Sequence, residues 1–232
     1  MLVPITALDD NYIWLYGREN LPVIVVDVPD FAPLLAYLQQ HQLQLEAVLL
    51  THNHADHVGG VAELKQYFPD VAIFASPECA DYATKVVCKG KIKTEHYEIE
   101  VIPSGGHTAQ HVSYLLDGNL FCGDALFSAG CGRVFTGDYA QMLRTLQRFK
   151  KLPNETLVCA GHEYTLSNLD FAEAVFSNKR AVQNQKVFVR ALRSRGKPSL
   201  PTTLGLEKQI NPFLQVDSLP EFIRLRQAKD KF

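Results

Sequence analysis

Residues 51–60 read Thr51-His52-Asn53-His54-Ala55-Asp56-His57-Val58-Gly59-Gly60. Three histidines and one aspartate lie within six positions, in the pattern H-x-H-x-D-H. The stretch follows the apolar, β-type run of residues 47–50 and precedes a helical pattern. It is therefore predicted to be a loop at the C-terminal end of a strand, where α/β folds tend to place their chemistry.

The side chains of this loop are ligands for borderline metals such as Zn, Fe or Mn. Four of them so close together are more than one ion needs, and neighbouring side chains on an extended turn diverge. We therefore expect His52 and His54 to meet at one point and Asp56 and His57 at another, which favours two metal ions side by side. The alternative on these residues alone is a polar surface loop without a metal.

Length and composition narrow the class of protein. The chain of 232 residues is long enough for one large domain or for one domain with an appendage. Its hydrophobic fraction of 47% and charged fraction of 21% are those of a globular protein. A formal net charge of −2 gives no electrostatic reason to expect nucleic acid or an anionic membrane as a partner. Neither a membrane span nor a secretory signal is expected.

The cysteines point to a reduced protein. There are five of them, an odd number, and none forms a C-x-x-C motif. We therefore expect scattered thiols and a cytoplasmic location, with metal ligation by His and Asp instead of Cys.

Other polar residues recur beside glycine at the ends of predicted strands. Gly106-His107 precedes a predicted strand at 112–116, Gly123-Asp124 follows one at 120–122, and Gly161-His162 follows one at 156–159. A metal site assembled on one sheet edge requires such a series. Asp27, at the end of a predicted strand at 23–26, is either a partner of the metal loop or the start of a helix.

The remaining pattern predicts alternating strands and helices up to Tyr164. Further strands are expected at 11–16, 71–74 and 94–101, and helices at 31–40, 61–68 and 141–152. His41 and His96 are expected on solvated faces, and residues 77–92 carry little signal. Beyond residue 166 the signals are helical, with a loop at 198–212 and a last helix at 218–231.

The motif series resembles the metallo-β-lactamase superfamily. The matching residues are H-x-H-x-D-H, Gly-His107-Thr, Gly-Asp124 and Gly-His162-Glu-Tyr164. Within that superfamily, residues 51–60, 131–133, 161–165, 211–213 and the pattern Arg226-x-x-Lys229-Asp230 resemble the glyoxalase II (hydroxyacylglutathione hydrolase) family. The resemblance implies an α/β fold, a four-layer αβ/βα sandwich with a C-terminal helical domain. It also implies a catalytic domain at 1–165 and a substrate-binding domain at 166–232.

The resemblance also assigns the candidate ligands. It implies that His52, His54 and His107 bind one ion, that Asp56, His57 and His162 bind another, and that Asp124 bridges both. The expected cofactors are two divalent metal ions, with zinc favoured and iron or manganese as alternatives. His111 matches a family position that is not a ligand, so support of a ligand or packing is expected of it.

For the glutathione arm of a substrate, the resemblance implies binding by five residues: Arg133, Phe135, Tyr164, Arg226 and Lys229. Glutathione has two carboxylates, which guanidinium and ammonium groups complement. Phe135 stands where some relatives have tyrosine. From charge alone, Arg226 and Lys229 would instead be the solvated face of a C-terminal helix.

The implied activity is hydrolysis of S-D-lactoylglutathione to D-lactate and glutathione, the second step of methylglyoxal detoxification. A hydroxide held between the two ions would attack the thioester carbonyl, with Asp56 and Asp124 as catalytic carboxylates. The expected form is a monomer acting on a small molecule. The alternatives are a persulfide dioxygenase-like oxidoreductase with one iron and a metal-binding domain without turnover.

Overall fold

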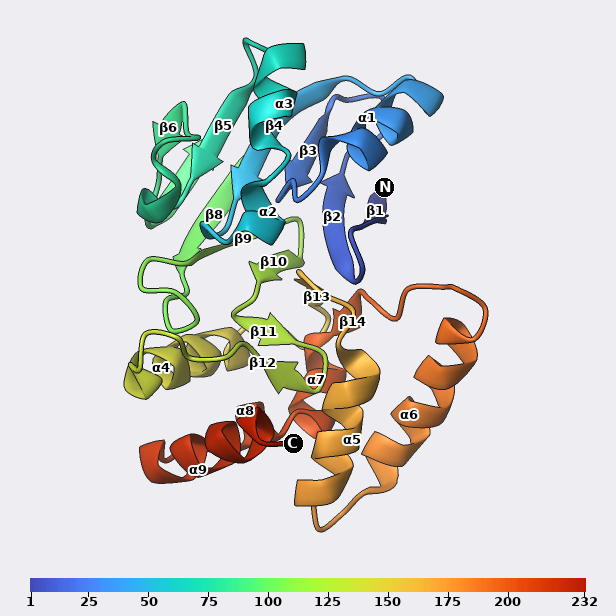
Figure 1. Cartoon of the computed structure of the whole chain (residues 1–232), viewed down its shortest axis with the longest axis vertical. Coiled ribbons are helices and arrows are strands. Elements are labelled where there is room, and N and C mark those ends of the chain that lie inside the picture. Colours follow the sequence, from blue (N-terminus) through green and yellow to red (C-terminus); the bar gives the residue numbers. More distant parts are fainter.

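The computed structural model describes residues 1–232 as two six-stranded sheets packed face to face, with helices on their outer sides (Figure 1). The first sheet has the order β1-β2-β3-β4-β5-β6. It begins with antiparallel strands and continues with parallel ones. Its strands are β1 (Leu2–Ala7), β2 (Asn11–Tyr16), β3 (Val23–Val26), β4 (Leu45–Leu50), β5 (Ala72–Ala75) and β6 (Lys85–Val86).

The second sheet has the order β14-β13-β10-β9-β8-β7. Only β10 and β13 run parallel; the other pairs are antiparallel. Its strands are β7 (Gly90–Lys93), β8 (Glu98–Pro103), β9 (Val112–Leu116), β10 (Asn119–Gly123), β13 (Leu157–Ala160) and β14 (Thr202–Thr203). A separate hairpin joins β11 (Leu126–Phe127) to β12 (Gly130–Cys131).

Alternation along the strands of the first sheet builds two cores. In β2, Trp14 faces the second sheet, whereas Ile13 and Leu15 belong to a separate cluster on the outer face. Strands covered on both faces read as continuous apolar runs, as residues 47–50 do. The outer cluster is closed by α1 (Phe31–Gln40) and α3 (Val61–Tyr67), and a short helix, α2 (Ala55–Val58), precedes α3. A 3-10 turn, η1 (Pro77–Cys79), follows β5.

The outer side of the second sheet is covered by α4 (Tyr139–Lys150) and by part of the C-terminal region. That region contains α5 (Thr165–Val175), α6 (Arg180–Arg193), α7 (Leu204–Ile210), α8 (Pro212–Gln215) and α9 (Leu219–Asp230). Helices α5, α6 and α7 share a small core of their own. By contrast, α8 and α9 contribute Phe213 and Phe222 to the main core.

The αβ/βα order of layers agrees with the expected fold, but several local predictions were wrong. The predicted loop at 198–212 contains β14, which pairs with β13, and α7, whose Leu204 and Ile210 are buried. Both elements are short and lie between prolines, so their apolar residues form no periodic pattern long enough to predict a strand or a helix. The division at residue 165 remains a prediction.

His96 is not on a solvated strand face. Strand β8 begins only at Glu98, because residues 94–97 form a turn in which Thr94 N–H donates to Tyr97 O at 3.0 Å. In that turn, His96 Nδ1 lies 2.7 Å from Glu46 Oε2. The alternation of charged and apolar residues that predicted the strand belongs to residues 98–101, and the turn lies directly before it.

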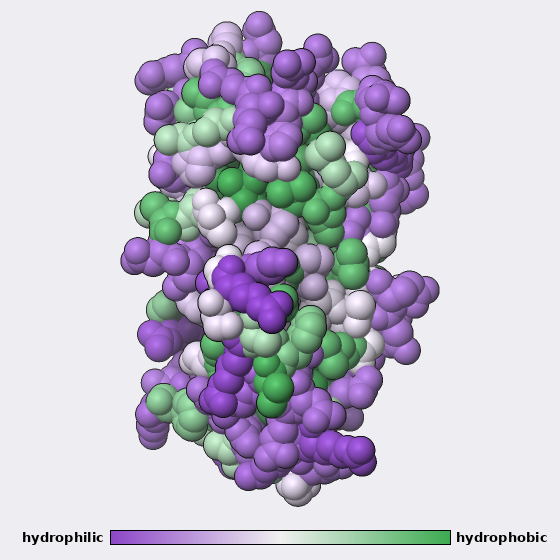
Figure 2. All heavy atoms as spheres, turned by 90° about the vertical axis from the view of Figure 1, so that its right-hand side faces the viewer, coloured by the Kyte–Doolittle hydropathy of each residue, from purple (hydrophilic) through white to green (hydrophobic).

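None of the helices combines the length and the apolar character needed to cross a lipid bilayer. The side of the molecule that carries α1 and α6 mixes hydrophilic and apolar side chains (Figure 2), as the outside of a folded protein usually does. All five cysteines are free thiols, as expected.

A buried carboxyl joins α7 to the β11–β12 hairpin. Glu207 is fully buried and accepts hydrogen bonds from Ser128 Oγ and Ala129 N, both at 2.7 Å. Burial raises the pKa of Glu207 from its ordinary 4.5 to about 7, although these donors oppose the shift. The folded state therefore holds a proton that the unfolded chain releases between these two pH values.

We predict that Glu207→Gln becomes more favourable relative to wild type as pH rises from 5 to 8. A raised carboxyl pKa gives stability that is present below the unfolded value and lost as pH passes the folded one. The glutamine does not titrate, so the difference in unfolding free energy should shift by on the order of 2 kcal/mol in its favour. Denaturant titrations at both pH values measure it. Glu63→Gln, at an exposed position of α3, should show no such trend.

Candidate metal centre

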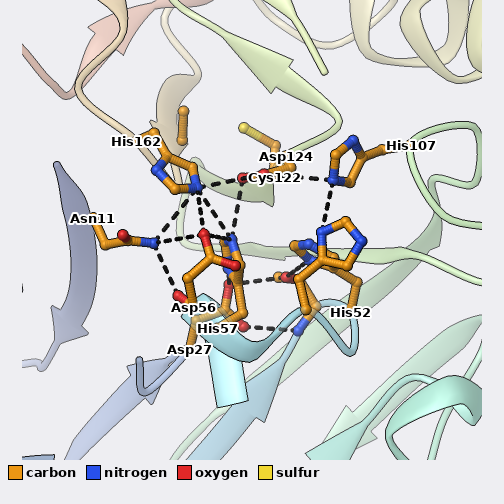
Figure 3. A network of polar contacts seen from close by, with 12 residues as sticks. Asn11, Asp27, His52, Asp56, His57, His107, Cys122, Asp124 and His162 are labelled. Atoms are coloured by element: carbon orange, nitrogen blue, oxygen red, sulfur yellow. Dashed lines mark hydrogen bonds and ion pairs between the residues drawn. The ribbon is translucent and has the colours of Figure 1, made fainter. Parts of the chain in front are cut away.

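The candidate ligands come from four segments that end at one edge between the two sheets (Figure 3). His52 and His54 follow β4, and the single turn of α2 presents Asp56 and His57. His107 precedes β9, Asp124 follows β10, and His162 follows β13. The sequence pattern predicted a single sheet edge, but β4 belongs to the first sheet, and β9, β10 and β13 belong to the second. The candidate ligands therefore meet between the two sheets.

The seven side chains form two groups. His52, His54, His107 and Asp124 make one, Asp56, His57 and His162 make the other, and within each group the ligand atoms lie within 4.8 Å of one another. Asp124 reaches both groups: Oδ2 is 3.5 Å from His107 Nε2 and 3.4 Å from His162 Nε2, and Oδ1 is 3.3 Å from His57 Nε2. This is the position that a bridging carboxylate would occupy.

Oxygen acceptors behind the rings fix the orientation of four histidines. The Nδ1 atoms of His57 and His162 each lie 2.7 Å from a carboxylate, of Asp27 and Asp10 respectively. His107 Nδ1 is 2.8 Å from Arg133 O. Each acceptor requires the proton on Nδ1, so Nε2 keeps a lone pair directed into the site.

His52 is oriented through a hydroxyl. Thr51 Oγ1 donates to Asp27 Oδ2 at 2.8 Å and therefore accepts from His52 Nδ1 at 3.0 Å. The Nε2 atom of this fully buried ring then has no hydrogen-bond partner, and neither does Asp124 Oδ1. Unpartnered buried polar atoms are costly unless a ligand satisfies them.

The site calls for positive charge at its centre. His57 Nε2 and His162 Nε2 face each other at 3.3 Å, a distance at which two lone pairs repel. Burial lowers the pKa of His57, but Asp124 and Asp27 outweigh it and hold that pKa well above its ordinary value. Burial lowers the pKa of His52, so that ring stays neutral. A proton on His57 supplies positive charge here, and a divalent metal held by the imidazoles and carboxylates would supply it in place of that proton.

Asp27 is a partner of the metal loop. It accepts from Thr51 N at 2.9 Å in addition to the Thr51 hydroxyl and His57. The alternative that Asp27 starts α1 is wrong, because Asp30 caps that helix through Ala32 N at 3.0 Å.

His111 supports the backbone of Asp124. Asp124 N donates to His111 Nε2 at 3.3 Å, and His111 Nδ1 bonds Ser104 Oγ at 2.8 Å. Its ring stacks on His52 with centroids 4.8 Å apart. It makes no ligand-type contact, which agrees with the role expected of it.

A pocket of about 600 Å³ opens over the two groups. Tyr164 stacks on His162 with ring centroids 4.6 Å apart and 7° between planes, and the exposed ring of Phe135 stands edge-on to His54 and His107. The side chains of Arg133, Lys229 and Asp230 also line this pocket.

Arg226 is not on a solvated helix face. It is only 5% exposed, and its guanidinium donates to Cys131 O at 2.6 Å and to Asp230 Oδ1 at 3.0 Å. Its Nε atom has no partner. Arg226 therefore secures the β11–β12 hairpin to α9 while lining the pocket. Lys229 is half-buried, with Nζ 3.1 Å from Ser167 O and 5.6 Å from the ring centroid of Phe171.

Three further residues support the site and were not predicted from the sequence: Asp10, Asn11 and Thr51. Asp10 and Asn11 precede or begin an apolar strand far from the histidine motif, and no spacing marks them. Thr51 adjoins the motif, but a hydroxyl before histidines has many other uses.

Two family profiles match the chain. Residues 13–90 and 89–162 match the profile described as metallo-beta-lactamase superfamily, and residues 163–232 match hydroxyacylglutathione hydrolase C-terminus. The chain is similar to solved structures of ETHE1 from Myxococcus xanthus and of the BLEG-1 B3 metallo-beta-lactamase. The first has a TM-score of 0.74 and 25% identity over 98% of this chain and 90% of that one. The second has a TM-score of 0.70 and 20% identity over 93% of this chain and 99% of that one.

Sequence relatives are closer. Hydroxyacylglutathione hydrolase of Glaesserella parasuis serovar 5 (strain SH0165) is 52% identical over 100% of this chain and 99% of its own. The protein of that name from Haemophilus ducreyi (strain 35000HP / ATCC 700724) is 48% identical over the same shares. With its motif series, its layered fold and these full-length matches, the chain belongs to the hydroxyacylglutathione hydrolase family of the metallo-β-lactamase superfamily.

Proposed function

We propose that the chain hydrolyses S-(2-hydroxyacyl)glutathione thioesters, with S-D-lactoylglutathione as substrate and D-lactate and glutathione as products. The observation that carries the proposal is the convergence of two His/Asp groups at Asp124, in a pocket that Arg133, Arg226 and Lys229 also line. The family membership supports the same activity. The reaction is the second step of methylglyoxal detoxification, and we propose a cytoplasmic monomer.

Two divalent ions, zinc by preference and iron or manganese as alternatives, fit the donor set. Bound there, they would lower the pKa of water from 15.7 to about 7 and polarise the thioester carbonyl. One ion would be held by His52, His54 and His107. The other would be held by Asp56, His57 and His162, and Asp124 would contribute to both sites. The oxygen acceptors behind the rings would keep the lone pairs aligned through the reaction.

The two carboxylates have different surroundings, which suits different tasks. Asp124 has a side chain only 8% exposed between the two groups, whereas that of Asp56 is 41% exposed at the edge of the pocket. We propose that Asp56 accepts a hydrogen bond from the attacking water and so directs its lone pair toward the carbonyl carbon. The leaving thiolate is stable enough to depart without a dedicated acid.

We propose that the pocket residues other than the metal ligands recognise the substrate; this part of the pocket, called the outer pocket, comprises Arg133, Phe135, Tyr164, Arg226, Lys229 and Asp230. Arg133 and Lys229 would bind the glutathione carboxylates, with Tyr164 and Phe135 beside the acyl group and Arg226 behind them. Asp230 Oδ1 lies 3.3 Å from Arg133 Nε and 3.0 Å from Arg226 Nη2. This carboxylate holds both guanidiniums in place before a substrate arrives. Residues 166–232 would thus contribute Arg226 and Lys229 to recognition, and the α/β domain would supply the chemistry and the other side of the pocket.

The mononuclear oxidoreductase alternative leaves one ligand group without purpose. His57 and His162 are both oriented by carboxylates, an arrangement that a single-ion site elsewhere would not need. A domain without turnover would not need the cationic outer pocket. Metal content measured together with thioester hydrolysis separates all three.

We predict two metal ions per wild-type chain. Asp124→Ala should weaken both sites, because its carboxylate lies in reach of both groups. His162→Ala should empty one. Elemental analysis of the purified proteins measures the stoichiometry, and one ion in wild type with equal loss in both variants would contradict the binuclear arrangement.

We predict that Arg133→Ala with Lys229→Ala lowers kcat/KM for S-D-lactoylglutathione at least about tenfold, which is 1.4 kcal/mol. The loss should fall mainly on KM, because the glutathione arm is held alike in ground and transition states. Metal content should not change.

There are two controls: an exposed arginine of α9, the helix that carries Lys229, and a truncated substrate. Arg224→Ala, outside the pocket, should behave as wild type. A small thioester lacking the glutathione arm should be hydrolysed equally by wild type and double variant. Equal loss on both substrates would mean that these cations maintain the fold and do not recognise the substrate.

A further inference from the structure

Asn11 lies at the edge of the second ligand group without belonging to it. It begins β2, is 5% exposed, and forms an isolated antiparallel bridge with His162. The next residue, Tyr12, donates its N–H to Gly161 O at 2.9 Å. The backbone of Asn11 is therefore fixed beside His162 by the sheet, independently of its side chain.

The side chain is aimed at Asp56 (Figure 3). Asn11 Nδ2 lies 2.8 Å from Asp56 O, 3.3 Å from Asp56 Oδ2 and 3.4 Å from His162 Nε2. The opposite orientation of the amide would place its oxygen against two oxygens of Asp56, so the nitrogen faces them. Its two hydrogens match the two Asp56 acceptors, which leaves the lone pair of His162 Nε2 free.

Asp56 has little else to hold it. It lies on the four-residue helix α2, whose N-cap residue His54 makes no side-chain cap hydrogen bond. The other groups close to its Oδ2 are the rings of His162, at 3.2 Å, and His57, at 3.9 Å. In the proposed function both rings are occupied by the metal, so the amide of Asn11 is the remaining donor that can set the carboxylate rotamer.

We propose that Asn11 is a positioning residue that fixes the carboxylate of Asp56 for metal binding and for the attacking water. A neutral donor suits this task, since it orients the carboxylate without removing the negative charge that a cation needs. Together with Asp10, which holds His162 Nδ1, Asn11 makes the β1–β2 turn a support for the second ligand group. The inference rests on the proposed function of that group.

The test compares Asn11→Ala and Asn11→Asp with wild type. Second-sphere partners of metal ligands are typically worth 10–100-fold in affinity or activity. We expect Asn11→Ala to bind one of two zinc ions about tenfold more weakly, measured by competition with a chromophoric chelator. On S-D-lactoylglutathione it should lose about tenfold in kcat with KM nearly unchanged. Asn11→Asp keeps the size of the side chain but removes both hydrogens and repels the Asp56 carboxylate, so it should lose more than tenfold in kcat.

Asn119→Ala is the matched control. Asn119 is also 5% exposed, and its Nδ2 also contacts backbone oxygens, of Leu116 at 3.0 Å and of Asp117 at 3.2 Å, in the β9–β10 turn. This variant should lose stability alone and keep zinc affinity and kcat. Thermal unfolding of all variants checks that they fold. If Asn11→Ala does not fold, the zinc affinity and kcat of Asn11→Asp test the role of Asn11.

The experiment distinguishes a failure of the proposed function from a failure of the role proposed for Asn11. A wild-type chain that binds fewer than two zinc ions, or does not hydrolyse the thioester, overturns the proposed function and this role with it. A wild-type chain that does both, with folded Asn11 variants matching Asn119→Ala in zinc affinity and kcat, overturns the role of Asn11 alone.

Discussion

The structure depends on one buried carboxylate, that of Asp124, whose negative charge must be balanced by positive charge close to it. Asp124 is 6% exposed and lies among the imidazoles of both ligand groups. Burial disfavours its charge, yet His57 and His162 hold its pKa well below the ordinary value. An anion and several lone pairs confined together are stable only with protons or metal ions between them, so the site is built around a cation.

Backbone space is arranged for this cluster. A Cβ on Gly161 would lie 2.7 Å from Asp124 Oδ1, and one on Gly132 would lie 2.0 Å from the carbonyl oxygen of Asp124. Gly123, with φ of +47°, turns the chain so that Asp124 points inward at the end of β10. Close approach to Asp124 thus requires glycine at 161, before His162, and at 132.

The C-terminal region is tied to the same centre by separate links. Glu163, next to His162, accepts hydrogen bonds from Tyr12 OH at 2.6 Å and from Ser199 N at 2.7 Å. It therefore connects β2 to the segment after α6. Arg226 reaches the hairpin that follows Asp124. The outer pocket is consequently held in register with the ligand groups by buried polar contacts as well as by the shared core.

The sequence by itself predicted alternating strands and helices, seven candidate ligands, and the pairing of His52 with His54 and of Asp56 with His57. The resemblance to the metallo-β-lactamase superfamily implied the layered arrangement. The elements and the ligands were accessible because strand periodicity, glycine and ligand chemistry are local, and because the loop carries four ligands within six residues. Only the tertiary structure decided the oxygens behind the rings, namely Asp10, Asp27, Thr51 and the Arg133 carbonyl, and the burial of Arg226. Each of these contacts joins segments whose register depends on how the two sheets pack, or depends on which face of a helix is covered. No local pattern encodes that packing: Arg226 looks like any basic residue of a C-terminal helix until Cys131 lies against it.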